Sequence, residues 1–316
     1  MELMVQQALL WATWPAWIRP LWVVALGMAA VLAAGVLLAG LLRLAAPRMA
    51  AVVAVTAKEG LLQPLFWVLL AIGAFFLILS PFISYNTLGE DIKMLKDGGL
   101  TSIMLLAVIV AVWSASYSVA EEIEGRIAVT VLSKPIGRLE FIFGKFLGVL
   151  TPSALMFVLL GGLFLATVSY KTVYEARETS SPDPTAADCL QQIAETAPGL
   201  ALGMMEVVVL AAIALAISTR LPLIPNLMIC ASIYALGHLM PTLVHVASQQ
   251  QALPYFIAQL FAAVLPMLDY FSMYTAISAS RPIPPDYLAW AALYSALYTS
   301  LALLLALLLF EDRDLA

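Results

Sequence analysis

The sequence has few charged residues and little cysteine or histidine. Charged residues make up 11% of its 316 positions, whereas a soluble domain usually has about 25%. The two cysteines, Cys189 and Cys230, are too few and too far apart for a disulfide-rich secreted domain. The two histidines, His238 and His245, have no cysteine or carboxylate pair nearby, so the sequence offers no zinc-type set of ligands.

Positive charge and catalytic motifs are also scarce. The net charge of −5 argues against nucleic-acid binding, which usually needs a basic face. A nucleotide-binding G-x-x-x-x-G-K-[ST] loop is missing; Gly144-Lys145-Phe146 comes nearest, but it lacks the hydroxyl and the correctly spaced first glycine. The G-x-S-x-G motif of serine hydrolases is missing too. We therefore expect that this chain is not an enzyme.

What the sequence does contain is a series of long apolar runs. Hydrophobic residues make up 63% of the chain, and the mean hydropathy is +0.98. A helix needs about 20 mainly apolar residues to cross a bilayer. We therefore predict an all-α, polytopic helical membrane protein. The predicted spans are Leu21–Leu42, Leu61–Tyr85, Leu100–Ala120, Phe146–Tyr170, Gly199–Ser218, Leu223–Ala247 and Tyr287–Phe310.

The segment Tyr255–Ile277 is also apolar, but Pro266 and Asp269 interrupt it. We predict that it is re-entrant, because broken helices are tolerated at membrane depth when the protein shields them; a crossing would give eight spans. With seven spans, nine of the fifteen Lys and Arg residues lie on the side of the 121–145 loop. Basic residues favour the cytoplasmic side, so we predict a cytoplasmic loop and an external N-terminus.

The chain divides into an N-terminal part and one membrane domain. Residues 1–60 contain the first span and a segment with Arg43 and Arg48, which is amphipathic enough to lie along the membrane surface. Residues 61–316 contain the other six spans. We predict an external loop over 171–198, with a short helix in its second half, which is either a solvated connector or a lid over an exit path.

The densest group of charges lies in the 121–145 loop, EEIEGRIAVTVLSKPIGRLEFIFGK, where eight charges fall in 25 residues. We expect a helix that continues the preceding span, a break at Ser133-Lys134-Pro135, and a second helix, because proline restricts the residue before it. Lys145 would reach the membrane surface with its ammonium group. The mixture of signs indicates a protein-binding surface, with solvated loop charges as the plainer alternative.

This loop resembles a known family. Its E-x-E-G-R, T-V-L-S-K-P-I-x-R and F-x-x-G-K-F motifs are similar to the coupling loop of type-2 ATP-binding cassette (ABC) exporter permeases. The broken segment at Leu265 to Phe271 and the terminal FEDRD resemble the same family. Ile127 departs from the family pattern, in which threonine usually follows the arginine. The resemblance covers the chain from about Lys58 to Ala316.

The resemblance implies the transmembrane permease subunit of an exporter, with six core spans and an added N-terminal one. A separate ABC ATPase subunit would bind ATP and Mg, so this chain would need no cofactor. The chain would pair with itself or with a related permease, among the lipids of a bacterial inner membrane. The coupling element that contacts the ATPase would comprise Glu121, Glu124, Arg126, Lys134, Pro135, Arg138 and Lys145.

Ionisable residues inside the predicted spans form a second candidate site, because charge at membrane depth is costly and usually functional. Glu206, His238 and Asp269 would form an intramembrane polar path. The plainer alternative is that such a histidine bonds a neighbouring backbone group. The sequence thus leaves two other functions open, an ion-coupled secondary transporter or channel and a membrane anchor that transports nothing.

Overall fold

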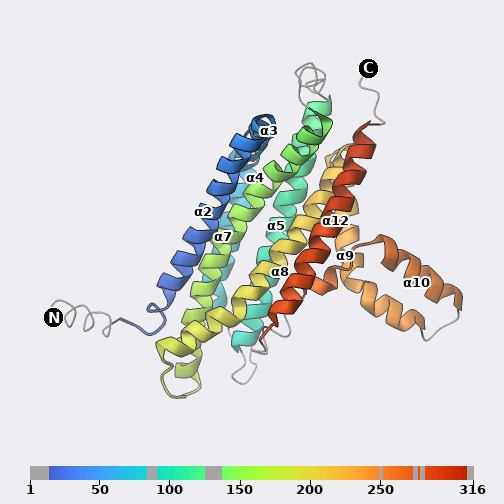
Figure 1. The fold of residues 1–316 in the computed structure, drawn as a ribbon. Helices are drawn as coiled ribbons and strands as arrows, with labels where there is room; N and C mark the ends of the chain where they lie inside the picture. Colours follow the sequence, from blue (N-terminus) through green and yellow to red (C-terminus); the bar gives the residue numbers. More distant parts are fainter. Residues whose placement is uncertain are drawn as a thin grey trace.

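The computed structural model describes residues 14–83, 91–124, 137–248, 252–272, 277 and 282–311. These residues form helices and connecting turns without a strand, which confirms the all-α class. Figure 1 shows the bundle, with short 3₁₀ turns at η1 (Ser80–Phe82) and η2 (Leu268–Phe271). The helices are α2 (Leu21–Ala45), α3 (Pro47–Leu62), α4 (Pro64–Leu79), α5 (Asp91–Glu124), α7 (Arg138–Glu178), α8 (Ala186–Ser218), α9 (Leu223–Ser248), α10 (Ala252–Val264) and α12 (Pro285–Glu311).

Within the described residues, seven helices are long and apolar enough to cross a membrane: α2, α4 with η1, α5, α7, α8, α9 and α12. They make the chain an integral membrane protein and match the seven predicted spans. The 13 residues of α10 rise only about 20 Å, less than the roughly 30 Å of a bilayer's hydrocarbon core. α10 is therefore too short to cross a bilayer.

α9 and α10 form a hairpin that leaves the bundle sideways. Pro241 lies inside α9, and a proline there removes the hydrogen bond to the carbonyl four residues earlier, which allows the helix to bend. A Cβ on Gly237 would lie 2.8 Å from the carbonyl oxygen of Pro266, so the chain after α10 approaches α9 closely at this bend. The hairpin lies beside the half of the bundle that is lower in Figure 1.

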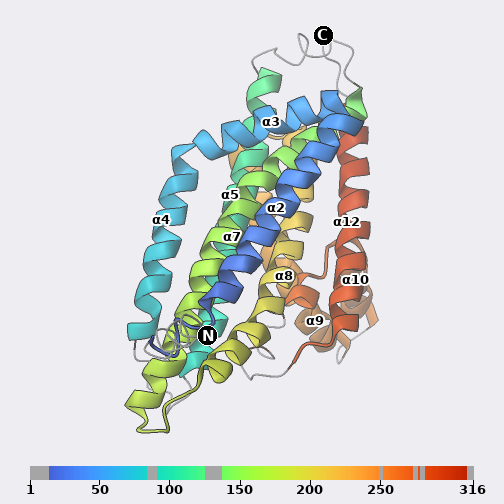
Figure 2. The ribbon, with the colours of Figure 1, turned by 60° about the vertical axis from the view of Figure 1, so that its left-hand side comes forward.

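The two ends of the bundle are distinct. We call the end where α5 stops and α7 starts the loop end, and the opposite end the far end (Figure 2). α2 and α12 both begin at the far end and finish at the loop end. Arg43, Arg48 and Arg220 thus lie on the same side as the 121–145 loop, as the seven-span prediction requires.

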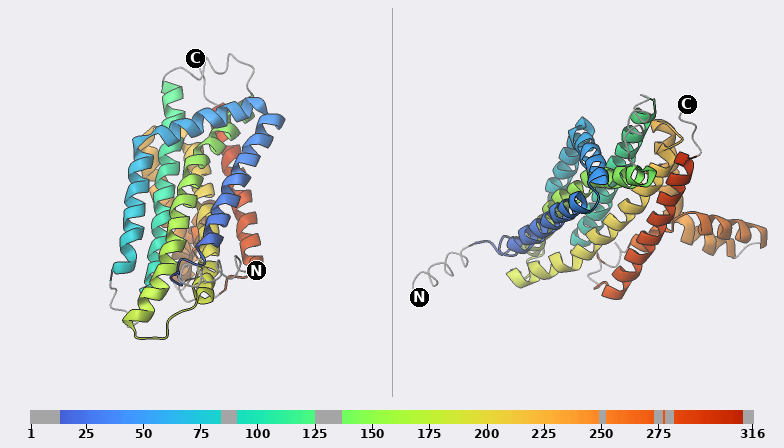
Figure 3. Two further views of the ribbon diagram at one scale, coloured as in Figure 1. Left: turned by 90° about the vertical axis from the view of Figure 1, so that its left-hand side faces the viewer. Right: turned by 45° about the horizontal axis from the view of Figure 1, so that its top comes forward.

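α3 runs across the loop end, as Figure 3 shows, in the manner expected of a surface helix. Ala46 and Gln63 leave the helical conformation directly before Pro47 and Pro64, because proline disfavours that conformation in the residue before it. α3 packs closely on α7. A Cβ added to Gly148 of α7 would lie 2.5 Å from the Cβ of Thr56 in α3.

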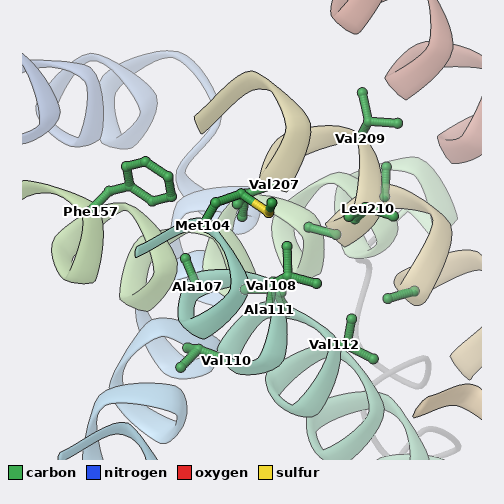
Figure 4. Close-up of a cluster of buried hydrophobic side chains, with 14 of the residues drawn as sticks. Met104, Ala107, Val108, Val110, Ala111, Val112, Phe157, Val207, Val209 and Leu210 are labelled. Atoms are coloured by element: carbon green, nitrogen blue, oxygen red, sulfur yellow. The ribbon is translucent and has the colours of Figure 1, made fainter. Parts of the chain in front are cut away.

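α5, α7 and α8 form the centre of the bundle. Their buried side chains interlock, as Figure 4 shows for Met104, Phe157 and Val207. α12 packs on α8, and α4 packs on α7. α2 lies outside this core, because Val24 is its only buried residue. A displacement of α5 or α7 would therefore move the buried side chains at the centre of the bundle.

Most of the 171–198 segment, which was predicted to be an external loop, is helical. α7 continues to Glu178 and α8 begins at Ala186, with Pro198 inside it. Thr185 and Asp188 start α8 by bonding each other's backbone N–H groups, at 2.8 Å and 3.4 Å, which is the capping-box pattern. Many polar residues of this segment lie in the end of α7 and the start of α8, where several of their charges are paired, as described below. The connection between the two helices is therefore short.

Gly148→Ala tests the close approach of α3 to α7. The added methyl group meets Thr56, so we expect a loss of about 1–3 kcal/mol in stability from overpacking and a fall of several degrees in the melting temperature in detergent. Gly40→Ala is the matched control, because a Cβ there would meet nothing within 4 Å, and alanine favours a helix over glycine. Equal melting temperatures for the two variants would contradict the packing described.

Candidate functional site

The residues of the predicted coupling element that the structure describes lie at the loop end. Glu121 and Glu124 are in the last turns of α5, and Arg138 is exposed in the first turn of α7. Arg126, Lys134 and Pro135 lie outside the described residues. The backbone N–H of Gly137 donates to Glu140 Oε2 at 3.0 Å, which fixes where the loop ends and α7 begins.

Lys145 does not reach the surface, contrary to our expectation. Its side chain is 1% exposed, and its ammonium group donates to the carbonyl oxygen and the hydroxyl of Ser118 at 3.3 Å and 3.1 Å. The ring of Phe141 lies 5.8 Å away, within reach of a cation–π contact. Partner oxygens within reach make burial of the ammonium group tolerable. Lys145 therefore ties the start of α7 to the end of α5.

A second buried lysine ties α7 to α5 at the far end. Lys171 is 1% exposed and lies 3.2 Å from the Asp91 carboxylate and 3.7 Å from that of Glu178. Its ammonium group also donates to the carbonyl of Pro81, and Glu175 accepts from the backbone N–H of Asp91 at 3.2 Å. The start of α5 is thus held against α7 by charge-assisted bonds.

A third buried lysine joins α5 to α8. Lys96 is fully buried and lies 3.8 Å from the Glu195 carboxylate. Sequence reasoning missed this far-end network because it assigned Lys171 and Glu195 to a solvated loop. One signal could have revealed part of it: Lys171 and Glu175 carry opposite charges four residues apart, which is the spacing of neighbouring groups on one face of a helix.

Inside the bundle, the structure brings together Glu206 of α8 and His238 of α9. Glu206 is fully buried, and its Oε1 lies 3.4 Å from His238 Nε2. The same nitrogen lies 3.0 Å from the hydroxyl of Ser272. Tyr234, one turn before His238, places its ring 4.6 Å from the imidazole. These four residues form what we call the polar cluster.

The hydrogen bonds of His238 define its role in the polar cluster. Nδ1 lies 3.1 Å from the carbonyl oxygen of Tyr234, and a carbonyl only accepts, so Nδ1 carries a hydrogen. In the neutral ring Nε2 then accepts from Ser272. Neither carboxyl oxygen of Glu206 has a hydrogen-bond partner among the described residues. A second proton on His238 would occupy Nε2, which lies 3.4 Å from Glu206 Oε1, so the two side chains are placed to form an ion pair when both are charged.

Asp269, the third predicted member of the polar path, does not join the polar cluster. It lies in η2 with an exposed side chain, whereas Ser272, a little further on, takes its place. Ser272 and Tyr234 were missed because no local pattern marks a serine or tyrosine as a contact of a distant glutamate. Among the described residues, no three His, Cys, Asp or Glu side chains are grouped to hold a metal ion.

No protein-family model matches the chain, and no curated protein matches it. The seven apolar helices fit a membrane transporter. The features that bear on a more specific function are the loop end, the polar cluster and the lysine contacts.

Lys171→Met tests the far-end network. Removing one partner of a buried ion pair leaves the other charge unpaired, which costs about 3–5 kcal/mol. We therefore expect a clear loss of thermal stability in detergent. Arg177→Met removes an exposed charge from the same helix and should leave stability nearly unchanged. A Lys171→Met protein that melts like its Arg177→Met control would show that the ion pairs contribute little.

Proposed function

We propose that this chain is the transmembrane permease subunit of an ABC exporter, driven by a separate ATPase subunit. The observation that carries the proposal is the position of the loop that resembles the coupling element. It joins α5 to α7, two helices of the core. A displacement of this loop by an ATPase would therefore move the centre of the bundle.

The contacts of Lys145 would help to transmit a displacement of the loop to the bundle. Its bonds to Ser118 hold the two flanks of the loop together, so that they move as one unit. Arg138, exposed at the start of α7, can contact a carboxylate of the ATPase through two parallel hydrogen bonds. Glu121 and Glu124 would face basic residues around the same groove.

In this proposal, two permease chains, identical or related, pair with two ATPase subunits in a bacterial inner membrane. ATP and Mg bind the ATPase subunits, and this chain supplies the substrate path and no catalytic group. Closure of the ATPase pair favours one of two bundle conformations, because a ligand shifts a conformational equilibrium by its difference in affinity for the two states. Lys96 and Lys171 join helices at the far end, so opening there would have to break their ion pairs.

The polar cluster favours a second candidate function, ion-coupled transport. Glu206 is fully buried, lacks a hydrogen-bond partner among the described residues and lies 3.4 Å from His238. Ionisable groups at membrane depth often lie on proton paths. This candidate requires function without ATP and a response to the proton gradient.

Arg126→Glu with Arg138→Glu tests the main proposal. We expect gentle purification from native membranes, followed by mass spectrometry, to recover a stoichiometric ATPase with a nucleotide-binding loop. Reversing the two charges should release that ATPase, because like charges would then meet in its groove, while the melting temperature of the bundle stays the same. Arg177→Glu, an exposed reversal at the far end, is the control and should retain the ATPase. Retention by the double variant would refute the docking role.

Glu206→Gln separates the two candidate functions. The carboxamide keeps the shape of the side chain but cannot exchange a proton, so ATP hydrolysis by the reconstituted complex should stay within about twofold of the wild-type rate, a change of only about 0.4 kcal/mol. Proton flux into liposomes, followed with a pH-sensitive dye, should be absent in both proteins. His245→Gln, on the exposed side of α9, is the control. A wild-type proton flux that Glu206→Gln alone abolishes would favour the ion-coupled function.

A further inference from the structure

Aromatic side chains line a hollow at the far end, between η2 and the first turns of α12. The hollow measures about 230 Å³ and is lined by Tyr270, Tyr287, Trp290, Ala291 and Tyr294. One water molecule needs only roughly 10–15 Å³, so a small organic group fits. Trp290 is 70% exposed and Tyr270 is 49% exposed. The hollow, which we call the aromatic pocket, is therefore open to the surroundings of the bundle.

Hydrogen bonds to the backbone hold these rings in place. The hydroxyl of Tyr287 donates to the carbonyl oxygen of Tyr270, and the hydroxyl oxygen of Tyr294 accepts from the N–H of Met267 at 2.9 Å. The rings of Tyr270 and Tyr294 meet edge to face, with centroids 5.7 Å apart. Two of the hydroxyls are thus engaged with the backbone, and the aromatic pocket presents mainly the faces and edges of rings.

Two acidic residues are adjacent in the sequence to tyrosines that line the aromatic pocket. Asp269 directly precedes Tyr270, is exposed, and interacts electrostatically with the phenol of Tyr287. Asp286 directly precedes Tyr287 and lies in the first turn of α12. The partial positive charge at a helix N-terminus would disfavour a cation, and Asp286 offsets it. Negative charge beside exposed ring faces is the combination that attracts a cation.

We propose that the aromatic pocket binds a quaternary ammonium group. The negative face of an aromatic ring attracts such a cation, and clusters of rings bind quaternary ammonium ligands. A primary ammonium group needs acceptors for three N–H donors, and the aromatic pocket is lined mainly by ring carbon. A quaternary ammonium group has no N–H to satisfy, so ring faces and nearby carboxylates suffice. The site does not depend on how the chain is energised.

The position of the aromatic pocket places the cation near a membrane surface. Tyr287 and Tyr294 lie two and nine residues after the start of α12 at Pro285, which corresponds to a depth of about 3–14 Å along the helix. This range covers the headgroup layer, which is about 5–8 Å thick on each side. The ammonium group can therefore come from a lipid headgroup or from a soluble molecule in the adjoining water.

Choline is the probe for the soluble source. We expect choline to bind the protein in phosphatidylglycerol nanodiscs by calorimetry, whereas its uncharged carbon analogue, 3,3-dimethylbutan-1-ol, does not. Trp290→Leu should weaken binding between about threefold and thirtyfold, the range of a cation–π contact, and Asp269→Asn should weaken it in low salt. Trp22→Leu is the matched control, because Trp22 is 57% exposed in the first turn of α2, at the far end of the bundle. This substitution should not change binding.

Native mass spectrometry tests the lipid source. Wild-type protein from mixed bilayers should retain phosphatidylcholine over phosphatidylethanolamine, and Trp290→Leu should lose that preference. Choline binding that depends on Trp290 supports a soluble ligand, and phosphatidylcholine retention that depends on Trp290 supports a lipid. If neither depends on Trp290, or the uncharged analogue binds as well as choline, the proposal is overturned and the rings only form part of an interfacial aromatic belt.

Discussion

The packing of the bundle depends on the requirement that buried ammonium groups have partners. Lys96, Lys145 and Lys171 are each at most 1% exposed, and an isolated charge in such surroundings would cost several kcal/mol. Each lysine lies close to oxygens of a neighbouring helix, so the sliding of α5 against α7 or α8 would separate charge from partner. Apolar contacts in a bilayer tolerate such sliding, because lipid tails are as apolar as the side chains. The lysines therefore fix the register of the core helices.

The sequence allowed the fold to be predicted where apolar runs are uninterrupted. All seven spans appear as helices, and α10 proved too short to cross, in line with the re-entrant prediction. Element ends were less predictable: α5 starts at Asp91 rather than near Leu100, and α7 runs to Glu178. Composition identifies polar residues but not their partners, so helix ends whose charges face inward resemble solvated loops.

The candidate sites were predictable to a smaller extent. Its place among apolar residues of a predicted span identified Glu206. Its contact with His238 follows from the packing of α9 on α8. Asp269 was misplaced because its position depends on how the chain returns from α10 to α12. That return is held by tyrosines of α12, such as Tyr298, whose hydroxyl donates to the carbonyl of Val264 at 2.8 Å. Contacts between such distant residues leave no periodic pattern in the sequence.

The hairpin of α9 and α10 also affects the lipids around the protein. It lies beside the far-end half of the bundle in Figure 1, and exposes large apolar side chains such as Phe256 and Phe261. Lipids of one leaflet must make room for it, whereas the other leaflet meets only the narrower bundle. The hairpin therefore adds apolar surface to one half of the bundle, so the two leaflets have unequal areas of protein to cover.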